Sequence, residues 1–163
     1  MEVPIKYIPK RLSKKDKKKQ SRQLKKSRKL YKKGIYHTRK KVSSFKSKKS
    51  NHLRNAERIY NIDSLKINRE LERKTGCSKK ALRKILKKGQ GAYYSSGSRP
   101  NQTSHSWGYA RLASAITSGK AAAVDFKILK NGCKKNSKAL RLAKKAKSKH
   151  NYGTRKVPKT KLK

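Results

Sequence analysis

Positive charge constrains this chain more than any other feature of its sequence. The 163 residues include 51 Lys and Arg but only 7 Asp and Glu, which gives a formal net charge of +44 at pH 7. Charge of one sign repels itself and opposes compaction. We therefore expect the chain to be stable against a polyanion, either nucleic acid or an acidic protein surface, and to be largely unstructured at both ends when isolated.

The charge is spread unevenly along the chain. Residues 1–50 hold 21 basic and 2 acidic residues, residues 132–163 hold 13 basic and no acidic residues, and five of the seven acids lie between. Hydrophobic residues make up 32% of the chain, which is below the usual share and enough for a small core only. We predict a basic N-terminal arm with one cationic helix (1–50), a small helical domain (51–132), and a basic C-terminal helix and tail (133–163).

Apolar residues recur at helical spacing through the middle of the chain, and no segment reads as a strand. The predicted fold class is therefore all-α, a small helical central domain flanked by long, extended or partly helical basic arms. The N-terminal cationic helix ends before Gly34 and has too few apolar side chains for a core-facing side, so we expect it to need a partner. The predicted N-caps are Ser13 (with Asp16 at N3), Ser50, Ser78, Ser106 and Ser137.

Residues 89–106 (GQGAYYSSGSRPNQTSHS) lack helical periodicity and are predicted to form a long polar loop. A loop of this length inside a compact domain is usually functional or bound. The large side chains in and beside it are Tyr93, Tyr94, Arg99 and Trp107. They either form a recognition surface with Arg99 at its tip or simply cover the helical core, and the sequence leaves both interpretations open.

Signatures of enzymes and metal sites are absent from the sequence. The TSGK run at 117–120 lacks the first Gly and the following Ser or Thr of a P-loop. The SHS run at 104–106 places a base beside hydroxyls, but side chains adjacent in sequence rarely face each other. Cys77 and Cys133 lie far apart without metal-ligand spacing, so we expect buried free thiols in a reducing compartment. We predict a non-enzymatic protein with no cofactor, no metal and no small-molecule substrate.

Runs of Lys and Arg are typical of chains that neutralise phosphates. Lysine heavily outnumbers arginine, which favours point-charge contacts over bidentate reading of bases, so sequence-specific DNA recognition is not expected. Tyrosines among the runs suit stacking on unpaired bases or packing on a protein. The predicted polyanion contacts are Lys14, Lys15, Lys17, Lys18, Lys19, Lys25, Lys26, Arg39, Lys40, Lys41, Lys144 and Lys145.

A second set of residues is predicted to dock on partner proteins by filling their pockets. These are Tyr7, Ile8, Tyr36 and Phe45 of the N-terminal arm, with Tyr93, Tyr94, Arg99 and Trp107 of the loop region. No apolar run approaches membrane-spanning length, and the N-terminal MEVPIKYIPK lacks the apolar stretch of a signal peptide. We expect a soluble protein that is made inside a cell.

The region from residue 71 to residue 133 carries a dense series of motifs: LERKTGCSKKAL at 71–82, GAYYSSGSRPNQTSHSWG at 91–108 and GKAAAVD at 119–125. On these motifs, and on Tyr7-x-Pro9-x-x-Leu12-Ser13 near the start, the chain resembles a family of small, highly basic proteins of nucleocytoplasmic large DNA viruses of the chlorella-virus type. The resemblance supplies no catalytic residues. It implies a virus-encoded protein that is a component of the particle.

Together these features give one leading hypothesis and two alternatives. The leading hypothesis is a minor capsid or internal virion protein, made in the host cell and located in the capsid interior. It would staple neighbouring capsid proteins and neutralise negative charge. The first alternative is a sequence-independent viral DNA-binding or packaging protein, and the second is a ribosomal protein, which composition and size also fit.

Overall fold

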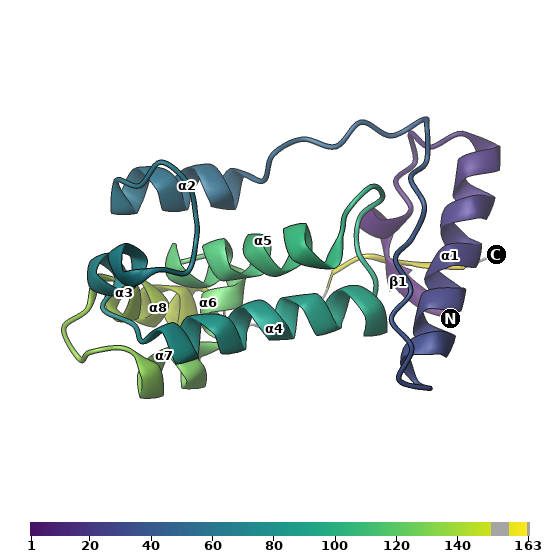
Figure 1. Cartoon of the computed structure of the whole chain (residues 1–163). Helices are drawn as coiled ribbons and strands as arrows, with labels where there is room; N and C mark the ends of the chain where they lie inside the picture. The colour runs from purple at the N-terminus through teal and green to yellow at the C-terminus, as the bar shows by residue number, and fades with distance from the viewer. Residues whose placement is uncertain (151–156, 163) are drawn as a thin grey trace. The chain divides into compact units, whose positions relative to one another are not determined.

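Helical structure dominates this chain, as its apolar periodicity predicts. The computed structural model describes residues 1–150 and 157–162, and within them it contains eight α-helices and one two-stranded sheet. The helices are α1 (Lys14–Tyr31), α2 (Asn51–Tyr60), α3 (Arg69–Thr75), α4 (Lys79–Ser95), α5 (Ser104–Ile116), α6 (Lys120–Val124), α7 (Phe126–Gly132) and α8 (Lys138–Lys149) (Figure 1). The all-α class is therefore confirmed. Residues 151–156 and 163 of the predicted basic tail lie outside the described residues.

The sheet is an element that the sequence did not predict. Strand β1 (Glu2–Pro4) pairs antiparallel with β2 (Lys159–Lys161), and Val3 lies opposite Thr160. A short 3-10 helix, Ile5–Tyr7, follows β1. Three-residue strands at the two ends of a chain leave no alternating pattern long enough to recognise in the sequence.

Four of the five predicted N-caps are confirmed. Ser13, Ser50, Ser78 and Ser137 each accept a hydrogen bond from a backbone N–H of the first helical turn that follows. The prediction for Ser106 is wrong, because α5 begins two residues earlier. The Ser106 N–H donates to Thr103 Oγ1, while the Thr103 N–H donates to Ser106 Oγ, so these two side chains cap the helix reciprocally.

The predicted long loop at 89–106 is also corrected. Helix α4 continues through Gly89 and Gly91 to Ser95, which leaves only residues 96–103 as loop. Gly89 lies against α5, where an added Cβ would come 2.7 Å from the Cα of Gly108. This glycine therefore allows two backbones to approach closely and does not end the helix.

The described residues divide into two compact units. Unit 1 contains Met1–Lys48, Gln90–Trp107 and residues 157–162, so it includes residues from all three segments of the charge distribution. Unit 2 contains Lys49–Gly89 and residues 108–150. Helices α4 and α5 each contribute residues to both units.

Unit 2 holds the larger apolar core. Its most deeply buried side chains include Leu82 and Ile85 of α4, and Leu112 and Ile116 of α5. Helices α6 and α8, which pack on each other, add small residues to this core: Ala122, Ala123, Ala139, Ala143 and Ala146. Burial raises the pKa of Tyr60, whose hydroxyl donates to the carbonyl of Ile116 at 2.6 Å.

Unit 1 holds two small apolar clusters. Val3, Tyr7, Leu24 and Leu162 form the first, with Ile8 and Trp107 packed against it. Leu12, Val42 and Phe45 form the second, which Ile8 also contacts. Unit 1 therefore buries few apolar side chains, and much of its cohesion must come from polar contacts.

The two cysteines form a disulfide, which corrects the expectation of free thiols. Cys77 and Cys133 are bonded across an antiparallel bridge in unit 2. Backbone hydrogen bonds flank this bridge: the Ser78 N–H donates to the carbonyl of Gly132, and the Lys134 N–H donates to the carbonyl of Gly76, each at 2.8 Å. The turn after α3 and the end of α7 meet only in the folded chain, so spacing in the sequence carries no sign of this pairing.

Candidate polyanion interface

Helix α1 has two faces of different character. Its buried side chains are Asp16, Gln20, Ser21, Leu24 and Ser27, which recur every three or four residues and so lie on one side of the helix. Leu24 is the single apolar residue among them. Hydrogen bonds therefore bind this face to the rest of unit 1. The sequence predicts that a helix with so little apolar surface needs a partner, and other segments of the same chain supply one.

Part of this face is bound by the segment 35–48, which we call the strap, whereas Gln20 Nε2 donates to the carbonyl of Tyr7 at 3.2 Å and Leu24 packs in the cluster of Val3, Tyr7 and Leu162. Lys19 Nζ donates to the carbonyl of Lys41 at 2.8 Å, and Gln23 Nε2 donates to the carbonyl of Lys40 at 2.9 Å. Further along, Ser27 Oγ donates to the carbonyl of His37 at 3.4 Å. Residue numbers fall along the strap as they rise along α1, so the strap runs antiparallel beside the helix (Figure 1).

Asp16 fixes the end of the strap to the first turn of α1. Its Oδ2 accepts from the Ser44 hydroxyl at 2.6 Å, from the Ser44 N–H at 2.8 Å and from the Ser43 hydroxyl at 3.3 Å. These hydrogen bonds, those from Ser44 above all, lower the pKa of Asp16 below its usual range. The carboxylate therefore has a structural task in unit 1 and is not offered to an outside ligand.

Arg39 is the predicted polyanion contact that the structure corrects. Its side chain is buried, and its guanidinium lies 3.7 Å from the ring centre of Tyr93. Its nitrogens donate to Ser27 Oγ at 3.0 Å, to Ser98 Oγ at 2.7 Å and to the carbonyl of Tyr93 at 2.9 Å. Burial lowers the pKa of Arg39, because the charged form is removed from water. Arg39 thus joins the strap to α1 and to α4 instead of facing a polyanion.

The opposite face of α1 carries the remaining cations and is exposed. Lys15, Lys18, Arg22, Lys25 and Lys29 follow each other at intervals of three and four residues, so they line one side of the helix. With Lys14 and Lys26, which are also exposed, they form what we call the cationic stripe. Charge runs predicted most of this stripe, but Arg22 and Lys29 were missed, because each stands apart from the lysine pairs and only the helical repeat aligns them.

The cations of the stripe have no ion-pair partner among the described residues. No Lys or Arg of α1 forms an ion pair in the part of the chain that the structure describes. An 18-residue helix extends about 27 Å, so the stripe presents its cations over the length of several nucleotides. Such a row of outward ammonium and guanidinium groups fits the phosphates of a nucleic acid or an acidic protein surface.

The other predicted polyanion contacts lie around the stripe or in unit 2. Lys17 and Lys19 of α1 are half-buried, and Lys40 and Lys41 of the strap are exposed. Lys144 and Lys145 are exposed on α8, in unit 2. The α1 and strap lysines therefore belong to one unit and surround one helix, whereas the α8 pair belongs to another surface.

The predicted docking residues divide by burial. Tyr7, Phe45 and Tyr93 are buried within unit 1, and Ile8, Tyr94 and Trp107 are half-buried there. Trp107 meets the Tyr7 ring edge-on at 5.9 Å between centres, so both side chains cover the chain's own core. Tyr36, whose side chain is 70% exposed, and Arg99 are the members of this set that remain open to a partner.

Unit 2 has a cavity of about 820 Å³ beside the disulfide, lined by residues of α3 and of the start of α8. Arg69, Arg73 and Lys134 supply exposed cations to it. Lys74 and Lys138 also line it, but Lys74 pairs with Glu70 at 3.1 Å and Lys138 Nζ donates to the carbonyl of Ile59 at 2.7 Å. The cavity therefore offers fewer uncommitted charges than the stripe.

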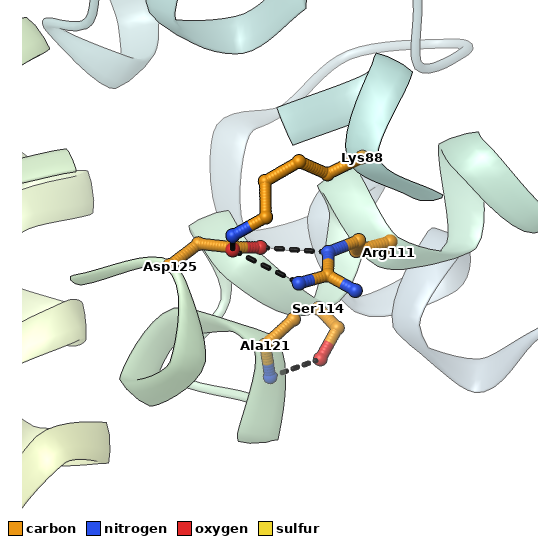
Figure 2. A network of polar contacts seen from close by, with 5 residues as sticks. All are labelled: Lys88, Arg111, Ser114, Ala121 and Asp125. Atoms are coloured by element: carbon orange, nitrogen blue, oxygen red, sulfur yellow. Dashed lines mark hydrogen bonds and ion pairs between the residues drawn. The ribbon is translucent and has the colours of Figure 1, made fainter. Parts of the chain in front are cut away.

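Asp125, whose side chain is buried, is the centre of a charge network with two partly exposed cations in unit 2 (Figure 2). Lys88 Nζ lies 2.6 Å from its Oδ1, while Arg111 donates from Nε to Oδ2 at 2.8 Å and from its terminal nitrogen to Oδ1 at 2.9 Å. Both carboxylate oxygens are engaged, so Asp125 serves to join α4 and α5 to the junction of α6 and α7. Beside it, Ser114 Oγ accepts from the Ala121 N–H at 3.2 Å.

Neither a metal-binding group nor a membrane-spanning helix is found in residues 1–150 and 157–162. No group of three or more His, Cys, Asp or Glu side chains there could hold a metal ion. None of the helices in that part of the chain is both long enough and apolar enough to span a membrane.

A comparison with known protein families assigns the chain to one of them. Residues 4–132 match a family of unknown function, DUF5824. The chain belongs to this family. The matched region runs from β1 to the end of α7 and so contains α1, the strap and the Asp125 network, whereas α8 and β2 lie beyond it. No curated protein and no solved structure matches the chain.

Proposed function

We propose that this DUF5824 protein is a non-enzymatic structural component of a large DNA virus particle, in which the cationic stripe of α1 neutralises negative charge. The stripe carries the proposal, because its cations lie on one face and have no ion-pair partner among the described residues. The motifs at 71–82, 91–108 and 119–125 support the viral assignment through their resemblance to basic proteins of such viruses.

The charge of unit 1 gives the proposal its physical reason. Residues 17–56 contain no Asp or Glu, so the repulsion among the α1 and strap lysines has no compensation within that segment. Binding a polyanion removes this repulsion and releases condensed counterions from the polyanion. The basic segments 1–50 and 133–163 would act as the arms of the protein, with α1 and α8 as their helical parts. Their partners would be acidic capsid surfaces or genome in the capsid interior.

Purified particles test the proposal directly. We expect the protein in particles that have been purified from infected cells, with cross-links from the α1 and strap lysines to capsid protein or to nucleic acid. Recovery of the protein from infected-cell cytosol and its absence from particles would contradict the proposal.

Sequence-independent DNA binding is the second candidate, and one observation favours it. Tyr7, Phe45 and Tyr93 are buried in the chain's own unit 1, so they are not available to fill the pockets of a capsid protein. After nuclease treatment of opened particles, a genome-binding protein would be released from capsid proteins, whereas a capsid staple would still co-purify with them.

A further inference from the structure

Three tyrosines gather at the C-terminal end of the cationic stripe. Tyr31 is the last residue of α1, Tyr36 lies at the start of the strap, and Tyr94 belongs to the last turn of α4. The rings of Tyr31 and Tyr94 are nearly parallel, at 10° and 6.1 Å between centres. The Tyr36 ring lies 5.1 Å from that of Tyr94 and 6.0 Å from that of Tyr31. All three belong to unit 1, and we call them the tyrosine cluster.

The tyrosine cluster packs against a buried ring and also has a member that is exposed to solvent. Tyr93, which is fully buried, meets the Tyr94 ring edge-on at 5.0 Å between centres. Tyr31 and Tyr94 are half-buried, whereas 70% of Tyr36 is exposed. Aromatic pairs at these separations attract each other beyond the area they bury. Tyr36 is therefore held by two other rings while most of its own surface faces water.

The surroundings of the cluster are cationic. Lys32 and Lys33 lie between Tyr31 and Tyr36 in the chain and are exposed, and Lys26 and Lys29 lie one turn back on α1. The pKa of His37, next to Tyr36, is lowered first by burial and then by the charges of Lys26, Arg39 and Lys40, so their positive field extends to this point. The sequence has no Asp or Glu from residue 17 to residue 56 or from residue 73 to residue 124.

We propose that the tyrosine cluster is a stacking platform for an unpaired base, so that the protein binds single-stranded nucleic acid through the platform and the stripe together. A duplex offers the stripe its phosphates but keeps its bases stacked inside. A single strand offers both phosphates and the faces of its bases, which stack on aromatic side chains without regard to sequence. An acidic protein partner would satisfy the lysines but would gain nothing specific from the ring faces. This inference rests on the proposed charge neutralisation by α1 and adds the class of ligand.

The test compares a 20-nucleotide oligo-dT with a 20-base-pair duplex by fluorescence anisotropy, using the full chain. We expect Tyr36→Ala to weaken oligo-dT binding by about 5-fold or more, since one base loses its stacking partner. Duplex affinity should change less than about 2-fold, since phosphate contacts are left in place. Tyr36→Phe keeps the ring and should bind oligo-dT like the unaltered protein.

Ile35→Ala is the matched control, because Ile35 is the exposed apolar neighbour of Tyr36 and lies outside the cluster. It should leave both affinities unchanged. Equal losses for oligo-dT and duplex in Tyr36→Ala, or no loss for either, would overturn the inference while leaving the proposed function intact. A cross-link from residue 36 to a capsid protein together with unchanged oligo-dT binding would likewise overturn it, in favour of a protein partner. Failure of the proposed function is a separate result: the protein would then be absent from purified particles, whatever the effect of Tyr36→Ala on oligo-dT binding.

Discussion

Asp125 is a carboxylate held away from water by two cations, and unit 2 depends on that arrangement. Its side chain is fully buried, whereas Lys88 and Arg111 reach it from positions that are partly exposed. The carboxylate accepts three hydrogen bonds from these charged groups, and removing its charge weakens all three. The network therefore stabilises the packing of α4 and α5 against the junction of α6 and α7 in unit 2.

We expect Asp125→Asn to lower the free energy of unfolding by about 2–4 kcal/mol, because Arg111 and Lys88 lose the charge that compensates them. Urea unfolding followed by circular dichroism measures the change. Asp63→Asn is the control, since it removes the same charge from an exposed position and should alter stability by less than about 0.5 kcal/mol. Equal effects of the two substitutions would show that the network is not structural.

Asp16 gives unit 1 a dependence on acid pH. Since hydrogen bonds lower its pKa in the folded chain, its contribution to stability is complete above the ordinary Asp pKa of about 3.9. That contribution is lost as the pH falls through the lower folded value. Ser44→Ala removes the strongest donor and should raise the pKa of Asp16, which NMR titration of the carboxyl carbon would detect. An unchanged pKa would mean that the strap does not bind the first turn of α1.

At the scale of elements, α1 shows what the sequence can and cannot predict. Its start at Ser13 and its end before Gly34 were predictable, because caps and turn glycines act locally. Its binding to the strap was not, because Gln23 and Ser27 read as solvent-facing residues unless their distant backbone partners, the carbonyls of Lys40 and His37, are known. The same limit applies to Arg39, which looks like one cation of a run and is buried among hydroxyls and a tyrosine.

Helix α4 and the disulfide illustrate two further limits. Gly89 and Gly91 signal a break in the chain, yet α4 continues through both, and at Gly89 the missing Cβ allows it to pack closely on α5. Cys77 and Cys133 meet because α3, α7 and α8 fold around one core, and no local pattern encodes that meeting. Of the candidate site, the lysine pairs were visible in the sequence, whereas the alignment of Arg22 and Lys29 with them required the helix.

Gly97 packs closely against Leu24 of α1 in unit 1. It has a φ of +94°, and an added Cβ would lie 2.7 Å from Leu24 Cδ2. Gly97→Ala should destabilise unit 1 by about 2–4 kcal/mol, since backbone strain and overpacking add together. Gly34→Ala meets a similar φ of +77° in open space and should cost only about 1 kcal/mol. Hydrogen exchange of the α1 amides would measure both, and similar values would contradict the packing of Leu24 against this loop.

At the scale of the whole molecule, net charge sets stability as well as binding. Among the described residues, three acids, Glu57, Glu70 and Asp125, form ion pairs in unit 2, while basic residues occur in both units and number 51 in the full sequence. Salt screens repulsion between exposed charges beyond about 8–10 Å. We therefore expect the melting temperature of the free protein to rise between about 0.02 M and 0.15 M NaCl, as calorimetry would show. A fall over that range would mean that ion pairs outweigh repulsion.

The salt dependence of duplex DNA binding tests the central claim, that the cationic stripe is the polyanion interface. One variant replaces Lys15, Lys18, Arg22, Lys25 and Lys29 with Gln. Its matched control replaces Lys80, Arg83, Lys84, Lys87 and Lys127, which are exposed cations of unit 2, so both variants lose the same charge. Each lost phosphate contact should reduce the slope of log K against log salt by about 0.9. The account predicts a slope shallower by several units for the stripe variant and an almost unchanged slope for the control. Equal reductions in the two variants would contradict it, because binding would then depend on total charge and not on α1.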